Sequence, residues 1–329
     1  MKARPIIFHC SFCKSVGLSR GILVHGNEFK QISALSAQKP IDQNRLIVTC
    51  RRCGVVFFAH QRKYFVKIEN SESIHSDDFL SIGLRTASKD ELYQKMIADF
   101  TQLLVELETK VSGLCLSNTI VADVGSGIGS LTAALAENGN RVISIEPSIN
   151  DLKLQQERQR NLADRIEHYS SVRESKLSKN AHHVKLVFAW QVIEHLKSPL
   201  ITLKEIRKIF PNQEYLIGSV PALHPRNISE YHKILLQEHT VIKWLGLSGY
   251  EIVYIEYVHV LGFINFVARN TGSNKHPHDI KSLGRDPYSL DELLTLQLFR
   301  GSLDSNILQG CIDNLSYKLQ LSQSQKDSA

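Results

Sequence analysis

The stretch from Thr119 to Ser148 reads TIVADVGSGIGSLTAALAENGNRVISIEPS and decides the fold. An apolar segment of strand length, Thr119 to Val124, runs into three glycines at alternating positions. Good helix formers follow as far as Asn138, and Gly139 is a typical helix stop. A second apolar segment then ends on an acid. The pattern predicts a strand, a glycine loop, a helix and a second strand with a carboxylate at its tip.

The loop and the acid together predict a nucleotide-like ligand. Gly125, Gly127 and Gly129 let a backbone approach a ligand closely, and Glu146 can accept hydrogen bonds from ribose hydroxyls. The spacing G-x-G-x-G is not the dinucleotide fingerprint, because Ser130 stands where that motif has its third glycine. The alternative is a tight turn between strand and helix in another kind of α/β protein.

This segment resembles the first motif of the class I S-adenosylmethionine-dependent methyltransferases, D-x-G-x-G-x-G, with Asp123 as its acid. The resemblance implies S-adenosylmethionine as cofactor and places Glu146 at the ribose. It implies these cofactor-binding residues: Asp123, Gly125, Ser126, Gly127, Gly129, Glu146, Trp190 and Gln191.

The rest of the domain continues the alternation of strands and helices. A helix with a long apolar stripe is expected over 88–111. Further helices are expected over 151–163, 199–210 and 239–247, and further strands over 165–169, 184–190, 214–220, 251–258 and 262–269. The last two strands are joined by too few residues for a crossover helix and must be antiparallel. The expected fold is α/β: a Rossmann-like methyltransferase sheet, mostly parallel with its last strand antiparallel, and helices on both faces.

The segment after the fourth strand, FAWQVIEHL over residues 188–196, resembles the E-V-L-E-H-L segment of a large methyltransferase subgroup. Gln191 stands where that subgroup usually has Glu. His195 is a candidate general base or acceptor-orienting residue, because its pKa lies near working pH, and Glu194 is its neighbour. The alternative is that Glu194 and His195 cap and brace the next helix.

A second candidate for acceptor contacts follows the fifth strand, over residues 220–232. Related enzymes with an N-terminal zinc module, including sugar C-methyltransferases, carry a loop rich in Tyr, Glu and His here. Tyr231 and His232 stand where that group has Glu-His, and Gln237-Glu238-His239 is a second match, so no carbon-methylation mechanism carries over. His232 is the first choice of base and His195 the second.

The N-terminal segment carries two C-x-x-C pairs, formed by Cys10, Cys13, Cys50 and Cys53. Four thiolates at this spacing close a tetrahedral structural zinc site with no open position for catalysis, and short strands are expected between them. Two disulfides or unconnected thiols are the alternatives. Cys115 and Cys311 stand in apolar surroundings, which favours burial.

Charge is unevenly distributed along the 329 residues. The net charge is +6, but residues 1–70 hold twelve Lys and Arg against three acids, a surplus of +9. The rest then holds 27 basic residues against 30 acids, or −3. The surplus suggests an anionic partner, either a nucleic acid, a nucleotide-linked substrate or a charged glycan, and a solvated basic face is the alternative. No apolar run reaches transmembrane length and the first residues lack a signal-peptide core, so a cytoplasmic protein without a membrane partner is expected.

These observations predict a zinc-ribbon module over 1–70, a linker over 71–88, a methyltransferase domain over 89–270, and a linker with a helical tail over 271–329. The tail's apolar stripe packs on the domain or on a second copy of the chain. The expected activity is methyl transfer from S-adenosylmethionine to a small acceptor, sugar-linked or otherwise anionic, by in-line displacement. Methylation of RNA held by the basic module and a non-catalytic binding protein are the alternatives.

Overall fold

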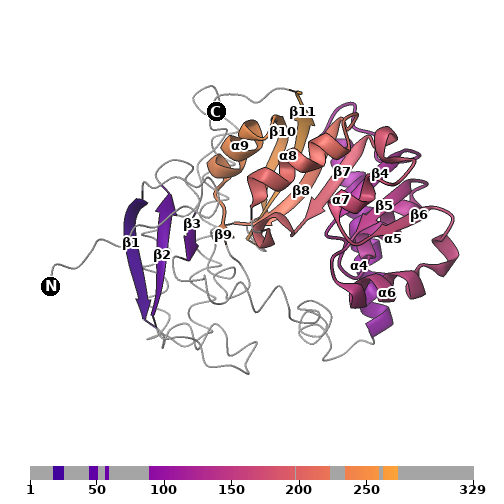
Figure 1. Cartoon of the computed structure of the whole chain (residues 1–329), viewed down its shortest axis with the longest axis horizontal. Coiled ribbons are helices and arrows are strands. Elements are labelled where there is room, and N and C mark those ends of the chain that lie inside the picture. The colour runs from indigo at the N-terminus through magenta and orange to yellow at the C-terminus, as the bar shows by residue number, and fades with distance from the viewer. Residues whose placement is uncertain are drawn as a thin grey trace.

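A seven-stranded sheet forms the centre of the computed structural model, which describes residues 18–25, 44–50, 56–58, 89–196, 198–222, 234–258 and 262–272. The sheet has the order β10-β11-β8-β7-β4-β5-β6 (Figure 1). Its strands are β4 (Ile120–Val124), β5 (Arg141–Ile145), β6 (Ile166–Tyr169), β7 (Leu186–Trp190), β8 (Tyr215–Pro221), β10 (Tyr250–Val258) and β11 (Phe263–Asn270). The pairings among β4 to β8 are parallel, and β11 is antiparallel to both of its neighbours. The predicted Rossmann-like sheet with an antiparallel last strand is confirmed.

Six α-helices accompany the sheet in the described part of the chain. They are α4 (Lys89–Lys110), α5 (Ser130–Glu137), α6 (Ile149–Arg158), α7 (Val172–Ser175), α8 (Pro199–Ile209) and α9 (Glu238–Leu247). Short 3-10 turns lie at η1 (Arg160–Leu162), η2 (Ala181–His183) and η3 (Ile193–His195). Helix α6 begins two residues before the predicted start, because the Ser148 hydroxyl accepts a hydrogen bond from Asp151 N and caps the helix there.

The helices bury an apolar core on each face of the sheet. In Figure 1, α7, α8 and α9 lie in front of the sheet and α4 lies behind it. The front core includes Phe210, Trp244 and Phe266, and the rear core includes Leu104, Leu135 and Phe188. Strands β4 and β7 are buried on both faces, which is why their sequences are almost continuously apolar.

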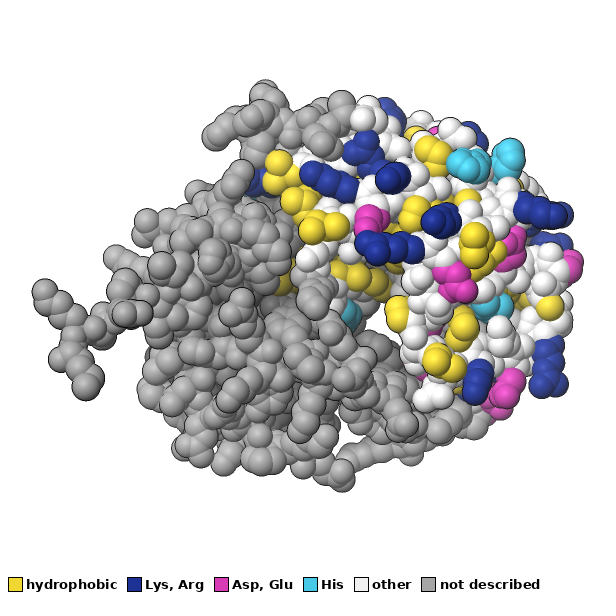
Figure 2. All heavy atoms as spheres, viewed as in Figure 1, with side chains coloured by type: hydrophobic (Ala, Val, Ile, Leu, Met, Phe, Trp, Pro, Cys, Tyr) yellow, Lys and Arg dark blue, Asp and Glu magenta, His cyan; other side chains and the backbone are white. Residues whose placement is uncertain are grey.

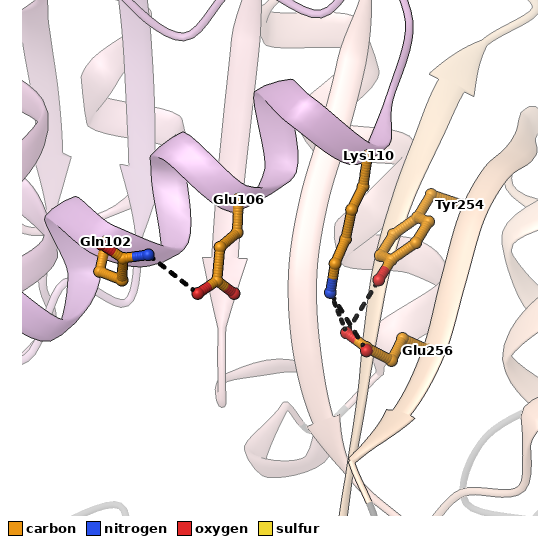
Figure 3. A network of polar contacts seen from close by, with 5 residues as sticks. All are labelled: Gln102, Glu106, Lys110, Tyr254 and Glu256. Atoms are coloured by element: carbon orange, nitrogen blue, oxygen red, sulfur yellow. Dashed lines mark hydrogen bonds and ion pairs between the residues drawn. The ribbon is translucent and has the colours of Figure 1, made fainter.

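A polar network fixes the far end of α4 to the outer strand β10. Lys110 Nζ lies 3.2 Å from both carboxylate oxygens of Glu256, and Tyr254 OH donates to Glu256 Oε2 at 2.8 Å (Figure 3). One turn earlier on α4, Gln102 Nε2 donates to Glu106 Oε1 at 3.1 Å (Figure 3). These groups lie at the surface, so the contacts set the direction of α4 more than they stabilise the fold.

A second sheet joins the N-terminal segment to the chain that follows β8. Its order is β1-β2-β3-β9, with β1 (Leu18–His25), β2 (Asn44–Cys50), β3 (Val56–Phe58) and β9 (Ile234–Leu235). All of its pairings are antiparallel. The predicted N-terminal strands are therefore present, and their sheet is completed by β9, which is distant in sequence and lies beside β3 (Figure 1).

The environment of Cys115 differs from the prediction. Its side chain is exposed, whereas Leu114 and Leu116 on either side are buried. The apolar residues around Cys115 are therefore buried without burying the thiol. Cys311 lies outside the described residues.

Lys and Arg side chains are scattered among apolar and acidic ones on the face that carries α7, α8 and α9 (Figure 2). Such a mixed surface differs from the concentrated positive charge predicted for residues 1–70. Among the described residues, no helix combines the length and the apolar character that crossing a membrane requires.

Candidate active site

The strand order places the topological switch point of the sheet between β4 and β7. Strands β5 and β6 continue the sheet to one side of β4, and β7 and β8 continue it to the other. In open α/β sheets, ligands bind outside the carboxyl ends of the strands at such a switch point. The glycine loop follows β4, Glu146 follows β5, and Trp190 and Gln191 lie at the end of β7. The fold therefore brings these predicted residues to one edge.

The three loop glycines have different roles. All have positive φ, at 72° for Gly125, 55° for Gly127 and 83° for Gly129. A Cβ on Gly125 would lie 2.4 Å from Val192 Cγ2, and one on Gly129 would lie 2.3 Å from Gln159 Nε2. A Cβ on Gly127 would meet nothing within 4 Å. Packing thus requires the outer two glycines, whereas the space beside the Gly127 Cα, where a side chain would point, is open.

Glu146 is bound to the loop itself. Its Oε2 accepts a hydrogen bond from Gly127 N at 2.8 Å, and its Oε1 accepts one from Ser148 N at 2.8 Å. Burial raises the pKa of this carboxyl, and the two backbone donors oppose the shift. Each carboxylate oxygen keeps a second lone pair, so Glu146 can accept from ribose hydroxyls while it holds the loop.

Asp123, the first acid of the motif, lies beneath the loop. It is 1% exposed and its Oδ2 accepts a hydrogen bond from Thr132 Oγ1 at 2.7 Å. Burial raises the pKa of Asp123 to about 7, and the Thr132 hydroxyl opposes the shift. The contact joins the end of β4 to the first turn of α5, so this carboxylate supports the loop from within the core.

A buried amide cluster under the loop was missed in the sequence. Gln155 on α6 and Gln159 at its C-cap are 0% and 2% exposed, and both donate hydrogen bonds to loop carbonyls. Ser126, predicted as a cofactor-binding residue, has its hydroxyl 2.8 Å from that of Ser144 and accepts from Gln155 Nε2 at 2.9 Å. The signal in the sequence is the spacing of four residues, which puts both glutamines on one helix face.

The end of β7 carries a strained residue. Gln191 has φ 54°, a left-handed conformation that few side chains adopt. Its backbone N donates to Ser219 O at 2.9 Å, and its Nε2 donates to Ser219 Oγ at 2.7 Å, so its amide is turned toward β8. Trp190 before it is half-buried and packs edge-on against Phe100 of α4, with ring centroids 5.9 Å apart. Strain of this kind is concentrated at functional sites.

Glu194 and His195 lie on η3, just beyond this turn. Glu194 is fully buried, and neither of its carboxylate oxygens has a hydrogen-bond partner among the described residues. Burial raises the pKa of Glu194 to about 8. His195 is 27% exposed, with Nε2 3.7 Å from Glu194 Oε1. The Glu194 side chain makes no described capping contact to α8, which weakens the bracing alternative for this residue.

An acid also lies at the tip of the third parallel strand, where the sequence shows only serines. Ser170, directly after β6, donates its backbone N to Glu174 Oε2 at 2.8 Å. Ser171 accepts from Glu174 N at 3.2 Å and caps the short helix α7. The carboxylate of Glu174 is therefore brought back to the carboxyl edge from four residues along the chain.

Several predicted residues lie outside the described part of the chain. They are His232 among the candidate bases and Cys10, Cys13 and Cys53 among the zinc ligands. Cys50 ends β2, where its backbone pairs with Leu18, and its side chain is not described. Within the described residues, no group of three or more His, Cys, Asp or Glu side chains is placed to hold a metal ion.

Comparison with known proteins gives a family match over residues 92–252. Residues 92–252 match a family model described as a methyltransferase domain. A 1,6-didemethyltoxoflavin-N1-methyltransferase from Burkholderia thailandensis is 15% identical, with a TM-score of 0.46 over 70% of this chain and 97% of its own. A magnesium protoporphyrin IX methyltransferase from Synechocystis PCC 6803, solved with bound S-adenosylhomocysteine, is 15% identical, with a TM-score of 0.42 over 63% and 93%. No curated protein matches the chain. Residues 92–252 therefore form a class I S-adenosylmethionine-dependent methyltransferase domain, and the predicted enzyme class is confirmed.

Proposed function

We propose that the chain transfers a methyl group to a small-molecule acceptor that is sugar-linked or otherwise anionic. The observation that carries the cofactor side is the open space beside the Gly127 Cα, next to the Glu146 carboxylate and at the switch point of the sheet. When bound, S-adenosylmethionine supplies a methyl group activated by a cationic sulfur. The residues that hold it in this proposal are Asp123, Gly125, Ser126, Gly127, Gly129, Glu146, Trp190 and Gln191.

The protein's part in such a transfer is alignment, exclusion of water and removal of a proton from the acceptor. In this proposal His232 or His195 takes that proton. For His195 the support is its partial exposure near the carboxyl edge of the sheet and its position 3.7 Å from the buried Glu194 carboxyl. His195→Gln and His232→Gln separate the two: the true base is the one whose loss lowers kcat and removes the pH dependence of the rate.

The acceptor side of the site is assigned to the segment after β8 and to the N-terminal sheet. Ala222 forms a parallel bridge with Leu236, and β9 just before it pairs with β3. Strand β9 also lies against η3, which carries Glu194 and His195. The N-terminal strands are thus connected through a single short strand to the candidate base, and a module placed there can select the acceptor.

Structural zinc on Cys10, Cys13, Cys50 and Cys53 is part of the same proposal, supported by the two C-x-x-C pairs and their spacing. The test is zinc content per chain after purification without added metal. Cys10→Ser and Cys53→Ser are expected to lose the metal, and Cys115→Ser, at an exposed thiol, is the matched control. Unchanged zinc content in the first two variants would overturn the four-thiolate site.

The acceptor is tested with a panel of nucleotide sugars, glycans and RNAs incubated with S-adenosylmethionine. The expected result is a mass increase of ~14 Da, one methylene, on a small anionic member. RNA is the second candidate because of the +9 surplus in residues 1–70, and methylated RNA with binding that weakens steeply with salt would establish it instead. Absence of S-adenosylmethionine binding by calorimetry, or binding unaffected by Gly127→Arg, would refute the assignment of this cofactor site.

A further inference from the structure

Two buried glutamines, one on α6 and one at its C-cap, hold the glycine loop from below. Gln155 and Gln159 are 0% and 2% exposed and lie four residues apart on the helix face that meets the loop. Buried amides are costly unless their hydrogen bonds are made, and here the partners are loop groups. Neither side chain is among the residues proposed to bind the cofactor or to take the proton of the acceptor.

Gln155 holds the peptide at Gly127. Its Nε2 donates to Gly127 O and, at 2.9 Å, to Ser126 Oγ, while its Oε1 accepts from Ser144 Oγ on β5 at 2.8 Å. Gly127 N donates on the other side to Glu146 Oε2 at 2.8 Å. The open glycine of the loop is therefore fixed through its carbonyl by α6 and through its amide by the acid after β5.

Gln159 holds the peptide at Gly129. Its Nε2 donates to Gly129 O at 2.7 Å and lies 3.1 Å from Tyr93 OH, which itself reaches Gly129 O at 3.4 Å. A Cβ on Gly129 would lie 2.3 Å from Gln159 Nε2, so the third glycine leaves the space that this amide fills. The Gln159 Oε1 atom is buried and has no partner among the described residues, so the described polar contacts of this side chain are all donated.

Tyr93 connects the same carbonyl to α4. Its ring is 3% exposed and lies under the Arg158 guanidinium, with 4.6 Å from Cζ to the ring centroid. Arg158 also forms an ion pair with Asp90 in the first turn of α4, at 3.4 Å. The start of α4, the end of α6 and the loop are thereby joined at one point.

We propose that Gln155, Gln159 and Tyr93 are positioning residues for the cofactor: they hold the Gly127 and Gly129 carbonyls toward α6 and so fix the orientation of the loop backbone toward the ligand. The inference rests on the proposed cofactor site at this loop. Its physical basis is that a carbonyl shares one rigid peptide plane with the N–H of the next residue. Holding the Gly127 and Gly129 carbonyls therefore sets the direction of Ile128 N–H and Ser130 N–H. A loop without these donors must be ordered by the ligand, which lowers affinity.

The test compares S-adenosylhomocysteine affinity by calorimetry in the full chain. Gln155→Leu and Gln159→Leu each remove a donor to a loop carbonyl, and Kd is expected to rise about tenfold. Tyr93→Phe removes the 3.4 Å contact to Gly129 O and the hydroxyl that accepts from Gln159 Nε2 at 3.1 Å, but it leaves the Gln159 donor to Gly129 O in place, so about a twofold rise is expected. In the double variant Tyr93→Phe/Gln159→Leu, the rise in Kd should not exceed the product of the rises in the two single variants, because both side chains contact the same carbonyl.

Matched controls come from the polar network on α4 and β10. Gln102→Leu and Tyr254→Phe make the same chemical changes in contacts that face solvent, and Kd is expected to stay unchanged (Figure 3). If a leucine variant fails to fold, Gln159→Glu keeps the side-chain shape and replaces the donor with an oxygen, and the same rise in Kd is expected.

A second measurement reports on the loop itself. In protein labelled with ¹⁵N-glycine, the Gly127 amide resonance, identified by its absence in Gly127→Ala, should shift in Gln155→Leu before any ligand is added and stay in place in Gln102→Leu. The positioning role would be overturned if both leucine variants bound S-adenosylhomocysteine with the Kd of the wild type and kept the Gly127 resonance at its wild-type position. Absence of binding in the wild type would instead refute the proposed cofactor site.

Discussion

Replacing Glu146 by Gln tests the double role of this carboxylate. Both of its oxygens accept a backbone N–H at 2.8 Å, one from Gly127 and one from Ser148. Glutamine has the same shape but only one acceptor oxygen, so one of these N–H groups must face an amide NH₂. The change therefore removes an acceptor and the charge without removing volume.

The magnitude follows from the contacts that are lost. A partly buried donor left without its acceptor costs about 1–3 kcal/mol, and hydrogen bonds to a charged group lie at the upper end of that range. Since 1.4 kcal/mol corresponds to tenfold in a binding constant, we expect Glu146→Gln to raise the Kd of S-adenosylhomocysteine by roughly ten- to hundredfold. Isothermal titration at neutral pH measures Kd, and urea denaturation shows how much of the loss falls on folding.

Glu256→Gln is the matched control, because Glu256 also accepts from two donors but lies at the surface (Figure 3). Its expected effect on unfolding is within about 0.5 kcal/mol, and Kd is expected to stay the same. If Glu146→Gln bound S-adenosylhomocysteine as tightly as the wild type, the Glu146 carboxylate would not accept hydrogen bonds from the ribose, and its hydrogen bond to the loop would not be needed for binding.

Three further predictions concern stability. Gly129→Ala is expected to lower the free energy of unfolding by about 2–4 kcal/mol, because the new methyl overlaps the side chains of Gln155 and Gln159. In Gly127→Ala the new methyl meets no atom, so urea denaturation should show a loss of only about 1 kcal/mol, caused by the positive φ. The wild type is expected to lose about 1 kcal/mol of stability per pH unit between pH 4.5 and about 8, because in that range the Glu194 carboxyl is protonated in the folded chain and ionised in the unfolded chain. Glu194→Gln lacks this titration and should become more stable relative to the wild type as the pH rises, and a stability difference independent of pH would contradict this. Thr132→Val removes the donor to Asp123 and is expected to cost about 1–3 kcal/mol, with the larger loss above pH 7, where the carboxylate is ionised; an equal loss at pH 5 and pH 9 would contradict the reasoning.

The sequence by itself determined the sheet and the location of its ligand edge. The strands from β4 to β11 agree with the predicted ranges to within two residues at each end, except for the short β9, which was missed. These signals are local: apolar runs of strand length, helix formers ended by glycine, and three glycines after a strand. The short connection between β10 and β11 also fixed their antiparallel pairing without any knowledge of packing.

Tertiary structure decided which polar groups support the site. Gln159 and Gly129 are 30 residues apart in the chain, and Tyr93 and Gly129 are 36 apart, so neither contact has a local signature. The two glutamines resemble solvent-facing residues of a charged helix until α6 is placed under the loop. The same holds for Glu194, whose burial depends on how η3 packs against β8 and β9.

The joining of the two sheets is also a tertiary property. Strand β9 has only two residues, and its partner β3 lies far away in sequence, with Val56 opposite Leu235 and Phe57 opposite Ile234. A pairing this short has no periodicity to read and is stable only where the rest of the fold brings the two segments together. Sequence therefore determined the glycine loop, because its geometry is set by neighbouring residues. The groups that hold the loop and the pairing of β9 with β3 were decided by contacts between distant residues.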